Sequence, residues 1–508
     1  MTVTPEFVLP QEVDVIVVGA GGSGLACALE AAARGARVWV CDKAPNPGGA
    51  TAWAVGAFTC SSSEHQARAG VQDSREQHFA DMDAVNAGAN RPDNLVLRRL
   101  LVDQAPDTLR WLMQLGVRFV GPQLETPHSR PRMHNAVPGG GALVYHLLRH
   151  CRRAGVQFQT QCELQDLIVQ DGRVAGVRVT LSGGRSASVH ARQAVVLASG
   201  DFSGSRDMRA RFFSAPVVNA EPVYPLNTGS PLRLMEERFG TRLVNADYAA
   251  FYIPRMRFVP ATSPSWLVRL PPSRLVTGLM QWSLEHLPAA LIRPFMMRLV
   301  TTVLGPEPAL FKQGAALINA SGKRIDLDLA SPARALTLDP GNRGYIVMDH
   351  AVASRFEAWP HFVSTAPGIA YAYLRDYRHS RPDIYRSAQT LEALAGLLQI
   401  PAATLLESMR AHWLELGRDP DQISGPFYAL GPVRGYITIT EGGLTVNDKL
   451  QVLDRDDQPV PGLWACGSAG QGGVLLDGHG HHLAWAFVSG RHVGQQLAAA
   501  PPQARAST

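Results

Sequence analysis

Three histidines and an aspartate fall within six residues near the C-terminus, in the stretch LLDGHGHH at 475–482. Asp477, His479, His481 and His482 are side chains that can hold a metal ion, transfer protons or shape a turn. Their spacing permits metal binding, but no second cluster in the sequence completes such a site. We therefore expect no metal, which leaves a structural role, contact with a cofactor, or contact with a substrate.

A second polar cluster, HSRPRMHN at 128–135, comes just before the glycines of PGGG at 138–141. His128, Arg130, Arg132 and His134 are its candidates for substrate contact. An arginine that faces a reacting molecule would favour an anionic substrate, because a guanidinium pairs with a carboxylate in two parallel hydrogen bonds. The alternative is a solvated basic loop.

The elements that must position these clusters begin at residues 13–42. The β-branched run at 13–18 predicts a buried parallel strand, and GAGGSG at 19–24 matches the pattern GxGxxG. An alanine-rich helix to about Arg34 and a second strand at 36–41 should follow, with Asp42 at the end of that strand.

Each part of this unit has a physical purpose. Gly19 permits a tight turn, Gly21 lets a pyrophosphate approach the backbone, and Gly24 lets the helix pack closely on the strand. The helix N-terminus offers free N–H groups to phosphate, and Asp42 can accept hydrogen bonds from ribose hydroxyls. The order of these parts predicts dinucleotide binding; an ordinary strand–helix crossover with spare glycines is the alternative.

Length and composition indicate a globular protein with two or three packed regions in 508 residues. The net charge of +5 is small and no Lys/Arg run occurs, which argues against nucleic-acid binding. The six cysteines form no CxxC pair, so free thiols in a reducing cytoplasm are expected. The N-terminus lacks the pattern of a signal peptide.

The rest of the chain alternates between helical and strand-like patterns. Asp171-Gly172 and Gly183-Gly184 mark two hairpins before a buried strand at 194–198. Residues 251–312 are rich in Pro, Leu, Met and Trp, and carry seven Lys/Arg against two Asp/Glu. Their segment 275–304 is basic and amphipathic, which fits a packed helix, a lipophilic entrance or peripheral membrane contact. Two helices are expected after residue 385.

Several motifs then occur in a recognisable order: the fingerprint with GGAT at 48–51, VVLASGDF at 195–202, INASGKR at 318–324, GPFYAL at 425–430, EGGLTVN at 441–447 and VPGLWACGSAGQGG at 460–473. The chain resembles the flavoprotein family of fumarate reductases and 3-ketosteroid dehydrogenases. The resemblance implies an α/β fold with a Rossmann-like, GR2-type FAD-binding domain split between 1–250 and 426–508. An α+β capping domain at 251–425 would be inserted between the two parts.

The resemblance also implies which residues contact the cofactor, FAD. Some relatives attach it through a histidine just after the paired glycines, and none follows here, so non-covalent FAD is expected. The contacts implied by the motifs are Gly19, Gly21, Gly22, Ser23, Gly24, Asp42, Lys43, Gly48, Gly49, Ala50, Thr51, Ala198, Ser199, Gly200, Gly467, His481, His482 and Leu483.

The branch of the family is indicated by departures from its patterns. Asp477 stands where dicarboxylate reductases have a substrate arginine, and Ile439 stands where they have a substrate histidine, which argues against fumarate itself. LDGHGHHLAWAFVSG at 476–490 matches the ketosteroid branch in length and in Gly478 and Gly480. There the N–H of the second glycine polarises a ketone, but Leu476 replaces the tyrosine that assists it.

We therefore predict an FAD-dependent dehydrogenase that introduces a C=C bond beside a ketone of a steroid-like ring or an alicyclic keto acid. Gly480, Arg130 and Arg132 are the predicted substrate contacts. The base is predicted among Tyr428, His479 and His134, in that order.

The alternatives are a reductase of an activated alkene, for which Arg334 lies near the family's proton-donating arginine, and a flavin-binding protein without catalysis. No haem-binding CxxCH occurs, so electrons should pass to or from a separate partner or oxygen.

Overall fold

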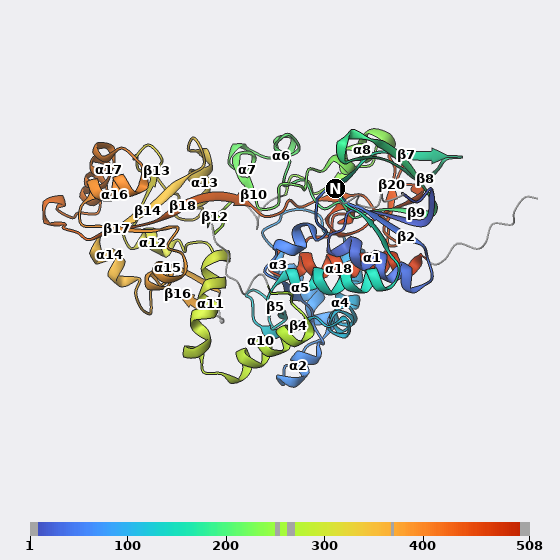
Figure 1. The fold of residues 1–508 in the computed structure, drawn as a ribbon, viewed down its shortest axis with the longest axis horizontal. Helices are drawn as coiled ribbons and strands as arrows, with labels where there is room; N and C mark the ends of the chain where they lie inside the picture. Colours follow the sequence, from blue (N-terminus) through green and yellow to red (C-terminus); the bar gives the residue numbers. More distant parts are fainter. Residues whose placement is uncertain (1–8, 249–253, 262–269, 367–369, 498–508) are drawn as a thin grey trace, which may run out of the picture.

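The computed structural model describes residues 9–248, 254–261, 270–366 and 370–497. Two lobes lie side by side along the longest axis of the molecule (Figure 1). The first lobe contains both the N-terminal elements and the C-terminal helix, and the second contains the middle of the chain. The fold is therefore the α/β arrangement, interrupted in sequence, that the motifs predict.

The first lobe is built on an eight-stranded sheet with the strand order β20-β21-β9-β1-β2-β6, to which β7 and β8 add an antiparallel extension. Strands β1, β2, β6, β9 and β21 run parallel, so their carboxyl ends meet at one edge. The sheet consists of β1 (Glu12–Val18), β2 (Val38–Cys41), β6 (Gln157–Gln159), β7 (Cys162–Gln170), β8 (Arg173–Leu181), β9 (Ser186–Leu197), β20 (Gln451–Leu453) and β21 (Pro459–Ala465).

Helices α1 (Gly22–Ala33), α4 (Leu95–Leu115), α5 (Gly140–Arg153) and α18 (His481–Gln496) pack together beside this sheet (Figure 1). The crossing of α1 and α18 is close because α18 carries glycines at the contact. A Cβ atom at Gly490 would lie 2.2 Å from the carbonyl oxygen of Ser23, and one at Gly494 would lie 2.5 Å from that of Cys27. The C-terminal helix is thus a core element of the first lobe.

The second lobe has a six-stranded sheet in which the long strand β18 (Phe427–Ile437) pairs with four neighbours. The other strands are β10 (Glu221–Pro222), β12 (Arg255–Phe258), β13 (Ala316–Asn319), β14 (Gly344–Met348) and β17 (Tyr385–Ala388). β18 runs from the far side of this lobe toward the first lobe, and β10 pairs with the end that reaches it.

Smaller elements complete the lobes. A three-stranded sheet is formed by β3 (Ala57–Thr59), β5 (Met133–Val137) and β4 (Arg118–Gln123), and β5, β4 and α2 (Glu64–Arg68) lie below α5 in the view of Figure 1. Helix α3 (Arg75–Val85) packs against α4. The remaining helices are α6 (Arg206–Phe212), α7 (Ala215–Asn219), α8 (Ser230–Phe239), α10 (Arg274–His286), α11 (Ala289–Val303), α12 (Ala309–Lys312), α13 (Pro332–Leu338), α14 (His350–Arg355), α15 (Leu374–Ser380), α16 (Leu391–Leu398) and α17 (Ala402–Glu415). Two short sheets pair β11 (Leu243–Val244) with β19 (Gly443–Leu444), and β15 (Ser364–Ala366) with β16 (Ala370–Ala372).

The structure confirms the two hairpins, between β7 and β8 and between β8 and β9, and the helix pair α16–α17. Strand β9 begins at Ser186, eight residues before the predicted start, because its first half pairs with β8. The amphipathic segment forms two helices because Pro288 forces Leu287 into an extended conformation, with φ −87° and ψ 144°. Within the described ranges, no helix is both long and apolar enough to cross a membrane.

The predicted domain limits at residues 250 and 425 remain predictions. β10, at 221–222, pairs with β18 and so belongs to the second sheet although it precedes residue 250.

Candidate active site

A long cavity opens at the edge of the first sheet where the parallel strands end. Its lining includes the fingerprint glycines after β1, Asp42 after β2, the turn after β9, and Gly467 after β21. Chain segments from the second lobe close its other side, including Arg255 and Arg257 of β12 and Thr438-Ile439 after β18. Ligands of open parallel sheets bind in such a crevice, where the strand order reverses.

The first part of the cavity is built to receive phosphate. Helix α1 begins at the fingerprint with Gly21 as its N-cap, and no side chain caps it. Gly21 has open space on its side-chain face, with no atom within 4 Å of a Cβ built there. A Cβ at Gly24 would lie 2.0 Å from the carbonyl oxygen of Gly19, so only glycine allows this turn. The N-terminus of α1 lines the cavity and can therefore bind an anion there.

The end of β2 provides a carboxylate beside this cradle. Asp42 accepts hydrogen bonds from the amides of Ala20 and Ala44, both at 2.7 Å. Burial raises the pKa of Asp42, and these two amides oppose that rise. Its carboxylate oxygens have further lone pairs that can accept ribose hydroxyls. Lys43, the next residue, reaches Thr228 with its Nζ at 2.5 Å.

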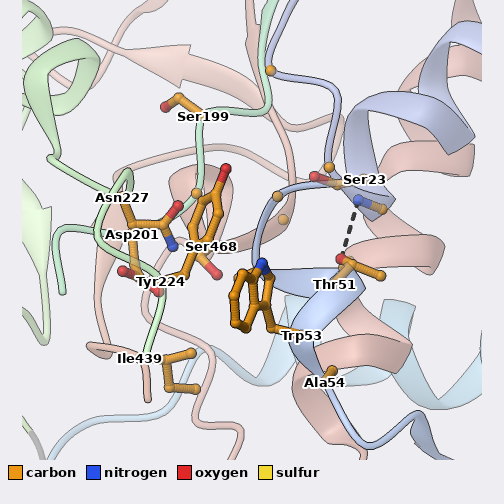
Figure 2. Close-up of a pocket in the computed structure, with 18 of the residues that line it drawn as sticks. Ser23, Thr51, Trp53, Ala54, Ser199, Asp201, Tyr224, Asn227, Ile439 and Ser468 are labelled. Atoms are coloured by element: carbon orange, nitrogen blue, oxygen red, sulfur yellow. Dashed lines mark hydrogen bonds between the residues drawn. The ribbon is translucent and has the colours of Figure 1, made fainter. Parts of the chain in front are cut away.

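The middle of the cavity has both polar and flat side chains (Figure 2). The Oγ of Ser199 is buried and has no hydrogen-bond partner among the residues described, as expected of a group that meets a ligand. Tyr224 and Trp53 approach the cavity from different segments, and burial raises the pKa of Tyr224 to about 12. Thr51 accepts a hydrogen bond from the amide of Gly22 at 3.1 Å, which holds the segment after the paired glycines against α1.

The glycine–histidine bend begins helix α18 and lines the cavity with His479, Gly480 and His482. Gly480 is the N-cap with φ +92°, and a Cβ there would lie 2.6 Å from the Oγ1 of Thr59. The carbonyl oxygens of His479 and Gly480 accept hydrogen bonds from Thr59, at 2.7 Å and 3.4 Å. This tight backbone contact fixes the bend, and only glycine fits position 480.

A glutamate holds the imidazole on each side of the bend. Glu125 contacts Nδ1 of His479 and accepts its backbone amide at 2.9 Å. Glu441, which is buried, lies 2.8 Å from Nε2 of His482. A carboxylate that binds one ring nitrogen fixes the orientation and the tautomer of a histidine, which is what proton transfer by the other nitrogen requires.

The side chain of His481 points away from the cavity. Its Nδ1 lies 2.6 Å from the carbonyl oxygen of Asp477, and its Nε2 lies 3.2 Å from Nε2 of His78. The ring of His128 lies 5.2 Å from that of His481, and its Nδ1 lies 3.0 Å from Nη1 of Arg132. Burial lowers the pKa of all three histidines, to about 4 for His481, to about 3 for His128 and well below the usual range for His78.

A positively charged sheet face approaches the cavity from the second lobe. Arg255 pairs across strands with Tyr436, and Arg257 with Arg434, so all four side chains lie on one face of β12 and β18. Glu221 neutralises Arg434 at 2.5 Å. Within the described part of the chain, Arg257 has no hydrogen-bond acceptor or ion-pair partner. Burial lowers the pKa of Arg257, and the positive charge of Arg255 lowers it further. This face can therefore bind an anion in the cavity.

Most of the predicted cofactor contacts do line the cavity. They are Gly19, Gly21, Gly22, Ser23, Asp42, Lys43, Gly49, Ala50, Thr51, Ala198, Ser199, Gly200, Gly467, His482 and Leu483. Gly24 and Gly48 lie behind the lining, where a Cβ would meet the carbonyl oxygen of Gly19 or, at 2.9 Å, the Cβ of Ala52. His481 is placed on the opposite side of the bend.

Of the predicted reacting and substrate-binding residues, the structure brings His479 and Gly480 to the cavity. Tyr428 lies at the far end of the 11-residue strand β18, about 30 Å from the end near the cavity at ~3.3 Å per residue. Arg334 is exposed on α13. His134 is buried, 2.8 Å from the Oγ of Ser63, and burial lowers its pKa to about 4. None of these three lines the cavity.

The two arginines of the 128–135 cluster also lie elsewhere. Arg130 is exposed and donates to the carbonyl oxygen of Ser129. Arg132 is buried in ion pairs with Asp73 at 2.8 Å and Asp81 at 2.5 Å, and a guanidinium paired on both sides in this way has a structural role.

Sequence reasoning missed four cavity or near-cavity groups, namely Glu125, Glu441, Arg255 and Arg257. The glutamates are distant in sequence from the histidines they hold, 354 and 41 residues away. One feature of the sequence could have indicated the arginines. In RMRF at 255–258, the two arginines are two residues apart, so in a strand they lie on the same face. That face becomes significant only once β18 brings it to the cavity.

Comparison with known proteins identifies the family of this chain. Residues 14–263 and 276–476 match the model of a family described as FAD binding domain. The NADH:fumarate oxidoreductase of Klebsiella pneumoniae (strain 342) is 25% identical over 505 residues, which span 96% of this chain and 48% of that protein. The vinyl phenol reductase of Lactiplantibacillus plantarum is 24% identical over 96% of both chains. This chain therefore spans about half the length of the first of these relatives and nearly all of the second.

Two solved structures share the fold. A flavocytochrome c3 fumarate reductase in an open conformation superposes with a TM-score of 0.69 at 22% identity, covering 96% of this chain and 78% of that one. The 3-ketosteroid-Δ4-(5α)-dehydrogenase of Rhodococcus jostii RHA1 superposes with a TM-score of 0.58 at 21% identity, covering 97% and 98%.

Proposed function

We propose, from the premise that the chain belongs to the FAD binding domain family, that it is an FAD-dependent oxidoreductase that acts on a C=C bond activated by a neighbouring electron-withdrawing group. We further propose that it works chiefly as a reductase of an anionic alkene such as an enoate. The observation that carries this proposal is that one cavity is lined both by His479, which Glu125 holds, and by two arginines, Arg255 and Arg257.

The residues of the cavity fit FAD. The uncapped N-terminus of α1 and the open face of Gly21 suit a pyrophosphate, and Asp42 suits a ribose. The unpartnered hydroxyl of Ser199, within the described chain, provides another contact along the cavity. Bound FAD supplies hydride chemistry to such a site. We propose non-covalent binding, since no histidine follows Gly48-Gly49 up to residue 58.

We propose His479 as the proton donor to the substrate. Adding two hydrogens across a C=C bond requires a proton at the carbon that does not receive hydride. His479 lines the cavity and its Nδ1 is engaged by Glu125, which orients the ring. Glu125 is therefore a positioning residue. The amide of Gly480, at the positive end of helix α18, can stabilise negative charge that develops on a carbonyl or carboxylate.

Arg257 and Arg255 are the proposed anion site. Both line the cavity from β12, and Arg257 is desolvated, so its pairing with a carboxylate would be strong. Dicarboxylate reductases bind their substrate with an arginine and a histidine where this chain has Asp477 and Ile439. Arg255 and Arg257 would take over the binding of the anion here. Electrons would come from a separate donor.

Dehydrogenation beside a ketone, the reaction that the sequence predicts, is the second candidate function. It is favoured by the fold shared with a 3-ketosteroid dehydrogenase, and His479 could serve it as the base. Reduction ranks first because both sequence relatives compared above are named as reductases or as a fumarate oxidoreductase, and because Tyr428, the first predicted base, lies far from the cavity.

An anaerobic substrate screen tests the proposal. The purified yellow holoprotein is reduced chemically, and re-oxidation is followed by absorbance on addition of enoates, vinyl phenols, and matched cyclic ketones and cyclic enones. The oxidised protein is mixed with the corresponding saturated compounds and an artificial electron acceptor. Fast re-oxidation by an anionic alkene is expected. Fast reduction by saturated ketones would favour the dehydrogenase, and no colour change with any compound would leave a flavin-binding protein without catalysis.

A further inference from the structure

Helix α10 exposes large apolar side chains to solvent on one face. Thr277 is fully buried, and its hydroxyl donates a hydrogen bond to the carbonyl oxygen of Ser273, one turn earlier, at 2.9 Å. On the opposite face, Leu275 is 87% exposed, Leu279 65% and Trp282 50%. These three positions follow one another at intervals of four and three residues, so they form one stripe on the helix surface.

Further exposed side chains follow in the turn and the next helix. The ring of His286 stacks on Trp282 with centroids 5.4 Å apart, and Leu291 at the start of α11 is 62% exposed. Single exposed leucines are common on proteins, but a contiguous apolar stripe is rare without a partner. We therefore expect the stripe to contact an apolar surface outside the described part of this chain.

We propose that the α10–α11 hairpin, residues 274–303, lies on the surface of a lipid bilayer, with Leu275, Leu279 and Trp282 inserted at the level of the headgroups. Tryptophan and histidine beside leucine suit that interface, where one end of a side chain meets water and the other meets hydrocarbon. The helices do not need to span the membrane for this contact.

The charge of the hairpin agrees with a bilayer that contains anionic lipid. The segment has three arginines against the single acid Glu285. Asp376 of α15 pairs with Arg293 at 2.6 Å, which reduces the excess of the hairpin from two positive charges to one. The attraction to anionic lipid is therefore modest, and burial of the apolar stripe provides most of the binding.

The size of the stripe favours a bilayer over a second copy of the chain. The exposed leucines and tryptophan together present an apolar area on the order of 500 Å², whereas a stable dimer buries about 800 Å² on each partner. The hairpin also lies at one edge of the molecule, where α10 adjoins β4 and β5 and α11 adjoins β16 and α15 (Figure 1). Contact through the hairpin would therefore hold both lobes against the membrane.

Vesicle sedimentation of the holoprotein tests this proposal. The probes are phosphatidylcholine vesicles with and without one third phosphatidylglycerol, at low and high salt. The variant Leu275→Gln/Leu279→Gln/Trp282→Gln should lose about tenfold or more in vesicle affinity, because burial of these side chains drives binding. The matched control Leu397→Gln/Leu414→Gln alters exposed leucines of α16 and α17, which are 51% and 64% exposed, and should bind as the unaltered protein does.

The flavin absorbance and the thermal midpoint of both variants should match those of the unaltered protein, since the changed side chains are exposed. Absence of vesicle binding by the unaltered protein, or equal binding by the triple variant, would overturn the proposal. A concentration-dependent dimer that the triple variant abolishes would overturn it in favour of a second copy of the chain.

Discussion

Lowering the pH from 7.5 to 5.0 should destabilise the folded protein through its buried histidines. His481 and His128 are held neutral by burial, with pKa values of about 4 and about 3. In the unfolded chain a histidine has a pKa near 6.5. The unfolded state therefore binds more protons than the folded state below pH 6.5, so stability falls as the pH falls through that value.

The size of the effect follows from these values. At pH 5.0 an unfolded histidine is largely protonated, whereas His481 in the folded protein is largely neutral. The difference amounts to about 2 kcal/mol for this one side chain, and to a similar amount for His128. Because the two histidines interact, their contributions to the free energy of unfolding do not simply add, and about 2 kcal/mol gives the order of magnitude for the cluster.

Thermal unfolding of the holoprotein, followed by circular dichroism at both pH values, measures the effect. Replacing His481 by Gln removes its titration, so the melting midpoint of the variant should fall by about 2 °C less than that of the unaltered protein between pH 7.5 and pH 5.0. The comparison between pH values is unaffected by the variant's own loss of packing. His379, an exposed residue of α15, provides the control His379→Gln, which should leave the pH response unchanged.

An equal pH response in the unaltered protein and the His481→Gln variant would refute the reasoning. It would mean that His481 is protonated in the folded protein or exposed to water. Buried acids such as Asp201, whose pKa is raised by burial, act in the opposite direction, and the variant comparison removes their contribution.

Three further outcomes test the site. His479→Gln should lower kcat by about two to four orders of magnitude while the flavin spectrum stays unchanged, as expected for loss of a proton donor; stopped-flow absorbance measures this. Arg257→Met should raise KM for an anionic alkene by about tenfold to a hundredfold, and the exposed control Arg130→Met should not, in steady-state assays. Gly24→Ala should yield a protein with little FAD after gel filtration, because its Cβ would lie 2.0 Å from a backbone oxygen, whereas Gly141→Ala has open space and should retain FAD.

The half of the cavity that we propose to bind the cofactor could be predicted from the sequence because its signals are local. The turn, the helix start and the acid after β2 all lie within residues 13–42, and Gly19 and Gly24 there have steric reasons that a sequence pattern records. The paired glycines at 48–49 and the turn after β9 are predicted in the same way.

The half with the proposed reacting groups could not be predicted in the same way because its contacts are long-range. Glu125 and His479 are 354 residues apart, and only the folded chain brings them together. The motifs predict that both His481 and His482 contact the cofactor, but successive residues of a helix differ in direction by about 100°. That rotation carries His481 to His78 and leaves His482 in the cavity.

The packing of α18 on α1 has a consequence during synthesis. Arg491 binds Glu30 across 461 residues of sequence, at 2.9 Å, so the fingerprint helix leaves the ribosome long before its partner exists. At about 5–20 residues per second, the nascent chain exposes the apolar flank of that helix for roughly half a minute or longer. Chaperone capture of ribosome-bound intermediates, and late acquisition of the yellow colour during translation, are the expected signs of this delay.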